Sequence, residues 1–218
     1  MTTPLPVKAP LRNQPQQARS RARLESVLAA ADRLLIREGA DALTTTRVAA
    51  EAGVSVGSLY HYLPDRDAIL HSLALGYLAG FEAQMELFVQ AAPTLGRDGA
   101  LDWDVLVENV INAYAEAFRS QAGYRALWFG RHLSEQTRAA DRAHNQTMAH
   151  GLHKIVLAMG VADSERLPTM CLTIQLTADA LMVEAFRDDP AGNEAMLTEC
   201  KRIVRSYIDS AGLTPAGA

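Results

Sequence analysis

Apolar residues recur at spacings of three and four along most of the chain, the period of an α-helix with one buried face. The first such pattern covers residues 21–37. Thr44 then offers an N-cap for a short helix that Gly53 stops, and Ser55 offers a cap for a third helix over 56–62. The first third of the chain is therefore predicted to form three helices, the last two of them short.

Longer helices are predicted for the remainder. Asp65 begins a helix that reaches about Gln90, and the Pro/Gly-rich segment 91–100 is expected to be a loop. The next helix begins near Asp102, and Gly123 is expected to break it before a short aromatic segment. Three further helical patterns cover residues 134–159, 164–187 and 192–211. Because no segment alternates with the period of a strand, the predicted fold class is all-α.

The last two predicted helices are apolar on more than one side. In the helix over 164–187, Met170, Ile174, Ala178, Leu181, Met182 and Ala185 line one side, and Leu172, Leu176, Val183 and Phe186 line another. A helix that is apolar on two sides must be covered on both. The pattern predicts a homodimer joined through the last two long helices, and a wholly internal core helix is the alternative.

The charge of the chain is unevenly distributed. The 218 residues are 49% hydrophobic and 21% charged, as in ordinary globular proteins, and carry a formal net charge of −4. Residues 1–70 hold nine bases and seven acids, whereas the rest holds 12 bases and 18 acids. Five bases precede the first acid, Glu25: Lys8, Arg12, Arg19, Arg21 and Arg23. Such a basic arm is suited to contact phosphates if a DNA-binding motif follows it, and a solvated tail would have the same composition.

The informative motif runs from Thr44 to Leu70: a short helix, a tight turn at Gly53 and a second short helix that Pro64 closes. Its apolar residues Val48, Ala49, Ala52, Val54 and Leu59 stand where they would hold the two helices at a fixed angle. The second helix then presents short polar groups and phenols, which reach base edges or phosphates without filling a groove. This arrangement predicts a helix-turn-helix.

Residues 21–70 resemble the DNA-binding signature of the tetracycline-repressor (TetR/AcrR) family. In that family a threonine-capped helix, a Gly-Val-Ser turn, a Leu-Tyr-x-x-Phe-Pro recognition helix and a capped fourth helix follow in this order. The resemblance implies a flexible basic arm over 1–20, a helix-turn-helix domain over 21–66 and a helical ligand-binding and dimerisation domain over 67–218. Beyond residue 75 the resemblance is only architectural.

The resemblance also implies the residues that contact DNA. Thr44 matches the cap of the second helix, Tyr60 a phosphate-binding tyrosine and Arg66 a basic residue that touches the DNA backbone. The implied contacts are Thr44, Thr46, Arg47, Ser55, Val56, Gly57, Ser58, Tyr60, His61, Tyr62 and Arg66. Val56 stands where a lysine is frequent and Leu63 where phenylalanine is usual, which leaves the operator sequence open.

Aromatic residues and methionines beyond residue 100 are candidates for an effector pocket. Pockets combine apolar walls with a few polar groups, although core packing uses the same residues. The candidates are Trp103, Tyr114, Phe118, Tyr124, Trp128, Phe129, His132, Met148, Met182 and Phe186. Few buried charges are expected among them, which favours a lipophilic or aromatic ligand. His144, His150 and His153 share one predicted helix, but their spacing supplies too few ligands for a metal, so neither metal nor cofactor is expected.

Together these features predict a homodimeric repressor that binds a palindromic DNA operator and is released by a small molecule. A ligand-independent regulator or activator whose C-terminal domain only dimerises is the alternative. No spacing typical of a nucleophile, a carboxylate pair or a metal cluster points to an enzyme. Cys171 and Cys200 fall inside apolar helical patterns, which predicts buried free thiols and a cytoplasmic protein. No apolar run is long enough to suggest a membrane partner.

Overall fold

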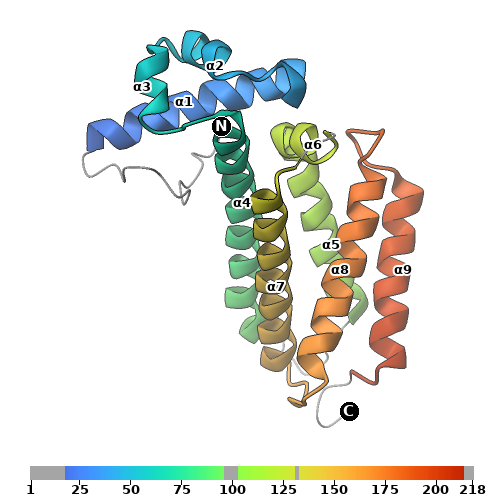
Figure 1. Cartoon of the computed structure of the whole chain (residues 1–218). Helices are drawn as coiled ribbons and strands as arrows, with labels where there is room; N and C mark the ends of the chain where they lie inside the picture. Colours follow the sequence, from blue (N-terminus) through green and yellow to red (C-terminus); the bar gives the residue numbers. More distant parts are fainter. Residues whose placement is uncertain (1–17, 96–102, 131–132, 214–218) are drawn as a thin grey trace. The chain divides into compact units, whose positions relative to one another are not determined.

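The computed structural model describes residues 18–95, 103–130 and 133–213, and no strand element occurs in these ranges (Figure 1). The predicted all-α fold is therefore confirmed. The described residues form two compact units. The first comprises residues up to Gly80 together with Gln121–Asp141, and the second comprises Phe81–Ser120 and residues from Arg142 onward. These two units do not coincide with the expected domain boundary at residue 66, since the first unit extends to Gly80 and includes Gln121–Asp141. The expected boundary between a DNA-binding and a ligand-binding domain stays a prediction.

The first unit contains α1 (Ala18–Glu38), the short 3-10 helix η1 (Ala40–Ala42), α2 (Thr45–Ala52) and α3 (Val56–Tyr60). It also contains the first half of α4 (Arg66–Leu95), all of α6 (Ala122–Trp128) and the beginning of α7 (Glu135–Ala158). Helix α1 packs against both α2 and α6. Its buried face consists of Leu24, Val27, Leu28, Ala31, Leu34 and Leu35, which follow the predicted helical spacing.

The predicted caps of the short helices are confirmed. Thr44 Oγ1 accepts from the Arg47 backbone N–H at 3.3 Å, and Ser55 Oγ accepts from the Ser58 N–H at 3.1 Å. Gly53 ends α2 in the left-handed conformation with φ 67°, which a glycine adopts without a Cβ clash. Helix α3 ends at Tyr60, two residues earlier than predicted, because the Tyr62 N–H bonds the Leu59 carbonyl in a tighter turn.

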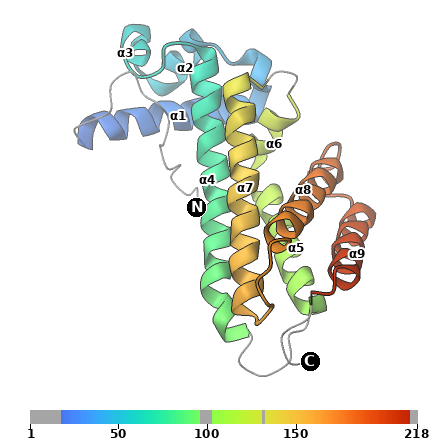
Figure 2. The same cartoon turned by 60° about the horizontal axis from the view of Figure 1, so that its bottom comes forward.

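The second unit contains the rest of α4 and α7, together with α5 (Trp103–Ser120), α8 (Leu167–Ala185) and α9 (Glu194–Ser210). Helices α8 and α9 lie side by side in both views, and α5 packs against α9 (Figures 1 and 2). Phe186, which the sequence pattern places on the second apolar side of this helix, directly follows α8 and is 1% exposed. The centroid of its ring lies 5.2 Å from that of the Phe118 ring.

Two predicted helix boundaries were wrong for identifiable reasons. Helix α4 continues through Pro93 to Leu95 instead of ending near Gln90. Pro93 lies two residues before the end of α4, so the hydrogen bond that its missing N–H would have made is one of the last in the helix. The break expected at Gly123 falls instead at Gln121, between α5 and α6, and Gly123 lies inside α6. Gly123 packs so closely on Tyr77 and Asp32 that an added Cβ would clash with them. Within the described ranges, no helix is both long enough and apolar enough to cross a bilayer.

Candidate nucleic-acid interface and apolar cavity

Helices α2 and α3 form a helix-turn-helix with an apolar inner side. Val48, Ala49 and Leu59 are at most 1% exposed and hold the two helices together across the turn at Gly53. The opposite side of α3 faces solvent, since Ser55, Gly57 and Tyr60 are exposed. Buried contacts therefore fix the orientation of α3 while leaving its outer side available to a partner.

Tyr60 is the most prominent aromatic group on this outer side, with 46% of its surface exposed. Its hydroxyl lies 3.2 Å from Thr45 Oγ1, a contact that joins the end of α3 to the beginning of α2. The rings of His61 and Tyr62 meet edge to face with centroids 5.2 Å apart. These contacts hold a phenol and an imidazole at the solvent-facing end of α3.

The residues expected to contact DNA are all accessible to some degree. Thr44, Thr46, Arg47, Ser55, Gly57, Tyr60 and His61 are exposed, and Val56, Ser58, Tyr62 and Arg66 are half-buried. Of the basic arm, residues 1–17 lie outside the described residues, and the side chain of Arg19 is not described either. Arg21 and Arg23 are exposed on the first turns of α1.

Two of the expected phosphate-contacting arginines already hold partners within the protein. The Arg47 guanidinium donates to the Ala42 carbonyl at 3.0 Å and to the Glu38 carboxylate. Arg66 donates to the carbonyls of Leu43 and Ala40 at 3.0 and 2.8 Å. Because Arg66 ties the start of α4 to the segment before α2, it positions the helix-turn-helix in addition to any contact with DNA.

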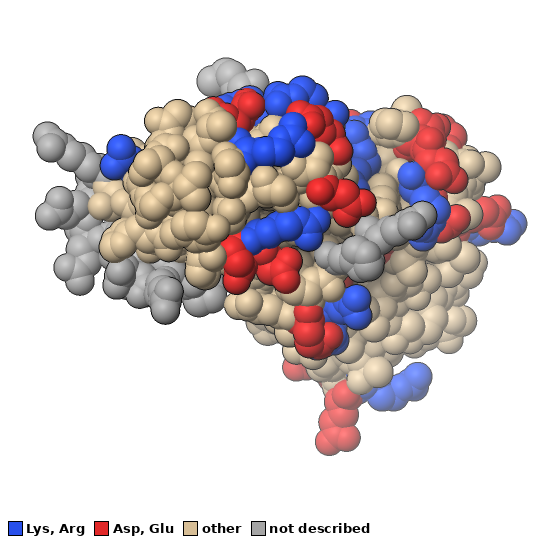
Figure 3. Space-filling view, turned by 45° about the horizontal axis from the view of Figure 1, so that its top comes forward, with Lys and Arg blue, Asp and Glu red and all other residues tan. Residues whose placement is uncertain are grey.

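Ion pairs between α1 and α2 moderate the positive charge of the first unit. Glu51 on α2 pairs with Arg33 and Arg37 on α1, each at 3.3 Å. The hydrogen bonds from Arg37 and Arg33 hold the pKa of Glu51 below its ordinary value, and those from Arg47 and Arg37 do the same for Glu38. On the face drawn in Figure 3, blue and red side chains alternate. Any phosphate that reached these arginines would compete with carboxylates.

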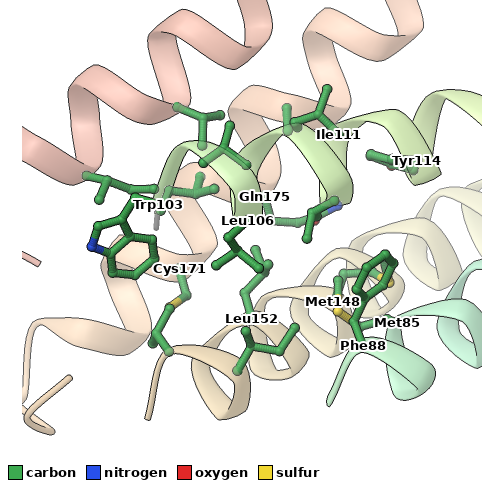
Figure 4. A pocket seen from close by; sticks show the side chains of 18 of the residues that line it. Met85, Phe88, Trp103, Leu106, Ile111, Tyr114, Met148, Leu152, Cys171 and Gln175 are labelled. Atoms are coloured by element: carbon green, nitrogen blue, oxygen red, sulfur yellow. The ribbon is translucent and has the colours of Figure 1, made fainter. Parts of the chain in front are cut away.

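The second unit contains a partly open apolar cavity of about 70 Å³. Helices α4, α5, α7, α8 and α9 all contribute to its wall, which is almost entirely carbon and sulfur. In Figure 4, Ile111 and Gln175 lie on one side of the space, and Leu152 and Phe88 lie across from them. Burial raises the pKa of the Cys171 thiol in this wall to about 11, so the thiol is neutral at physiological pH. Cys171 and Cys200 are both free and buried, as predicted.

The expected pocket residues divide between the two units. Trp103, Tyr114 and Met148 line the cavity. Phe118, Met182 and Phe186 are buried in the same unit, but the cavity lining does not include them. Tyr124, Trp128 and Phe129 belong to the first unit, where the rings of Tyr124 and Trp128 stack with centroids 4.3 Å apart. His132 lies outside the described residues. Sequence spacing alone did not distinguish these three environments.

A buried polar network adjoins the cavity. Tyr114 Oη donates to Asp179 at 2.7 Å, and Gln175 Nε2 donates to Asn145 Oδ1 at 3.0 Å. A side-chain hydrogen bond also joins Asn145 to Asp179. Burial raises the pKa of Asp179 above its ordinary value, while the bond from Tyr114 and the charge of His144 act in the opposite direction. Gln175 and Asp179 were not predicted, although two polar residues four apart in an apolar helix were a visible signal.

The three histidines considered for a metal have separate surroundings. His144 is 4% exposed, and its Nδ1 lies 3.1 Å from Glu82 Oε1. His153 Nε2 lies 3.2 Å from Asp163 Oδ1, and His150 is exposed on α7. Across the described part of the chain, no three His, Cys, Asp or Glu side chains gather as a metal would require.

A helix-turn-helix with an exposed recognition helix, joined in one chain to a helical unit that contains an apolar cavity, defines a class of DNA-binding regulators. Residues 27–73 match the model of bacterial regulatory proteins of the tetR family, and residues 101–210 match that of the tetracyclin repressor-like C-terminal domain. The chain belongs to the tetracycline-repressor family of transcriptional regulators. Members of this family are transcription factors and not enzymes.

Individual relatives agree with this assignment. An uncharacterized HTH-type transcriptional regulator of Haemophilus influenzae is 36% identical over 62 residues, which are 28% of this chain and 33% of that protein. A TetR-family regulator from Streptomyces coelicolor has 25% identity and a TM-score of 0.58, with 86% of this chain and 98% of that chain covered. The regulator FadR from Bacillus subtilis, solved in complex with stearoyl-CoA, has 14% identity and a TM-score of 0.62, with 85% and 97% covered. At that identity the likeness to FadR concerns the fold alone.

Proposed function

We propose that this protein is a homodimeric repressor that binds a palindromic operator and releases it when a small apolar molecule enters the cavity. The observation that carries the proposal is the helix-turn-helix, whose inner residues are buried while Tyr60 and its neighbours face solvent. A second protomer would place a second α3 roughly 34–36 Å away, one turn of B-DNA, so that two recognition helices read successive major grooves.

Each part of the outer side of α3 has a suitable role in this interface. Ser55, Gly57 and Ser58 stand where short side chains and backbone N–H groups approach a phosphate. Val56 suits contact with a thymine methyl, and Tyr60 offers a hydroxyl to the DNA backbone. The exposed Arg21 and Arg23 supply further positive charge. We expect affinity to fall steeply with salt, because each neutralised phosphate releases counterions.

The cavity supports release by a ligand through a shift in population. A ligand that binds better to a conformation with the wrong separation of recognition helices draws the protein away from DNA. Helix α4 is the proposed lever, because one unbroken helix contributes residues 66–80 to the first unit and 81–95 to the second. The stearoyl-CoA bound to the FadR structure is an example of an apolar chain bound by a protein of similar fold.

The DNA contact is tested by first selecting an operator from random duplexes with the full-length protein, and then measuring affinity by fluorescence anisotropy. Tyr60→Phe removes one hydroxyl and is expected to weaken operator binding about tenfold to a hundredfold, the worth of one hydrogen bond to a charged group. Tyr207→Phe makes the same change on α9 and serves as the control, with light scattering used to check that it keeps the mass of the wild type, because α9 belongs to the proposed dimer interface. Equal operator affinity of wild type and Tyr60→Phe would contradict the assigned role, and failure to select any sequence would contradict operator binding itself.

The alternative, a regulator that needs no ligand, is distinguished by the response of the DNA complex to small molecules. Compounds that raise the unfolding temperature of the free protein are expected to lower its operator affinity, since a ligand stabilises the state it prefers. Ligands that stabilise the protein without changing its operator affinity would favour the ligand-independent alternative.

A further inference from the structure

The cavity wall sets limits on the charge of its ligand. Among the described residues that line it there is no Lys, Arg, His, Asp or Glu. The lining residues with polar N–H or O–H groups are Gln84, Trp103, Tyr114 and Gln175, and the Trp103 Nε1 is buried without a hydrogen-bond partner. A charged group placed there would lose its hydration without gaining a counter-charge, which is costly in an apolar site. The enclosed part of a ligand must therefore be neutral.

The polar network determines how Tyr114 can bind a ligand. A phenol has one O–H to donate and lone pairs that accept. Tyr114 donates its O–H to Asp179 at 2.7 Å, so toward a ligand its oxygen can act only as an acceptor. A hydrogen bond with Asn145 also holds the Asp179 carboxylate in place. A ligand group that bonds to Tyr114 must then be a hydrogen-bond donor.

Gln175 adds a second requirement on the same ligand group. Gln175 is 3% exposed, and its Nε2 donates one N–H to Asn145 Oδ1 at 3.0 Å. An amide nitrogen carries two N–H groups, so one donor remains besides the carbonyl oxygen. A group that donates to Tyr114 and accepts from Gln175 satisfies both. A hydroxyl does this with a single oxygen, whereas an ether or a ketone can only accept.

We propose that the effector is a neutral, mainly apolar alcohol or phenol whose hydroxyl binds between Tyr114 and Gln175. The inference rests on the proposed effector cavity and specifies its chemistry. The apolar body of the ligand would lie against side chains such as Leu152 and Ile155, with Met85 and Met148 adapting to its shape.

The test compares ligands that differ at one group. Full-length protein is titrated calorimetrically with 4-ethylphenol, with 4-ethylanisole, in which a methyl group replaces the donated proton, and with the anion 4-ethylbenzoate. Wild type is expected to bind 4-ethylphenol about fivefold to tenfold more tightly than 4-ethylanisole, the worth of one neutral hydrogen bond. Binding of 4-ethylbenzoate is expected to be weaker than that of either neutral compound.

Single substitutions show which residues cause the preference for 4-ethylphenol over 4-ethylanisole. Tyr114→Phe is expected to reduce the preference for 4-ethylphenol to within about twofold while 4-ethylanisole binds as before, which also shows that the cavity is intact. Tyr207→Phe, a tyrosine of the same unit that does not line the cavity, is the matched control and keeps the preference. Gln175→Met, which keeps the length of the side chain, tests the second hydrogen bond should Tyr114→Phe not fold.

The outcomes separate this inference from the proposed function. The proposed hydroxyl site is wrong if 4-ethylanisole binds wild type as tightly as 4-ethylphenol, or if Tyr114→Phe and Gln175→Met both keep the preference. In either case the cavity still binds a ligand, and the proposed function is not contradicted. If neither neutral compound binds, the proposed effector cavity itself is contradicted, and the hydroxyl assignment with it.

Discussion

At the scale of single residues, Gly123 shows how a packing constraint differs from a conformational one. The glycine lies in α6 at an ordinary helical position, yet Tyr77 and Asp32 occupy the space that a Cβ would need. The Tyr77 hydroxyl donates to the Asp32 carboxylate, and burial raises the pKa of Tyr77 further, so the phenol stays neutral. Gly123 therefore allows α6 to approach this buried bond between α1 and α4.

Gly123→Ala is expected to lower the free energy of unfolding by about 1–3 kcal/mol, because the added methyl overpacks a rigid site. Gly80→Ala is the control, since its Cβ would meet only the flexible end of Gln121 at 3.4 Å and alanine favours helices. Urea denaturation measures both. A Gly123→Ala protein as stable as the Gly80→Ala protein would show that Tyr77 and Asp32 move aside easily.

Asp179 predicts a pH dependence at the same scale. Its pKa in the folded state is raised above the ordinary value of 3.8, so the folded chain keeps a proton that the unfolded chain has already released. Wild-type stability therefore falls as pH rises through this window. Asp179→Asn removes this titration together with the interaction between the Asp179 carboxylate and the charge of His144.

The Asp179→Asn protein is therefore expected to gain stability relative to wild type between pH of about 4.5 and about 7.5. Urea denaturation of both proteins at the two pH values measures the difference. A relative loss over this interval would mean that the hydrogen bonds to Asp179 outweigh its burial and lower its pKa.

At the scale of elements, α2 and α3 have eight and five residues, too few to be stable helices without caps and tertiary contacts. Thr44→Ala removes the cap of α2 and is expected to cost about 1 kcal/mol of stability. Thr46→Ala, two residues further on at an exposed site, is expected to stay within about 0.5 kcal/mol of wild type. Thermal unfolding measures both, and equal losses would show that the Thr44 hydroxyl does not cap α2.

At the scale of the whole molecule, the proposed dimer accounts for apolar side chains left exposed on α8 and α9. Leu176 is 49% exposed and Ile203 is 43% exposed, although each belongs to a helix whose other side is buried. A second protomer would cover both, and two linked recognition helices are what a palindromic operator requires.

Leu176→Glu is expected to convert the dimer to a monomer, because a carboxylate would lose hydration in an apolar interface. Leu87→Glu is the matched control, since Leu87 is 66% exposed on α4, which is not one of the two helices of the proposed interface. Light scattering measures the mass of each. A Leu176→Glu protein that stays dimeric, or a wild type that is monomeric, would contradict the proposed interface.

The sequence by itself determined the helices, their caps and the helix-turn-helix. These features depend on residues a few positions apart, such as Thr44 with Arg47 or the glycine turn at Gly53, so their physical causes are local and visible in the order of residues. The outer side of α3 follows from the same local pattern, because the inner apolar residues fix which side remains exposed.

Only the tertiary structure decided which aromatic residues share an environment. Tyr124 and Tyr114 are ten residues apart and look alike in sequence, yet one packs on Tyr77 in the first unit and the other lines the cavity of the second. The pairing of Tyr114 with Asp179 joins residues 65 positions apart. Such contacts depend on how distant helices pack, and helical periodicity specifies the buried side of each helix but not its partner.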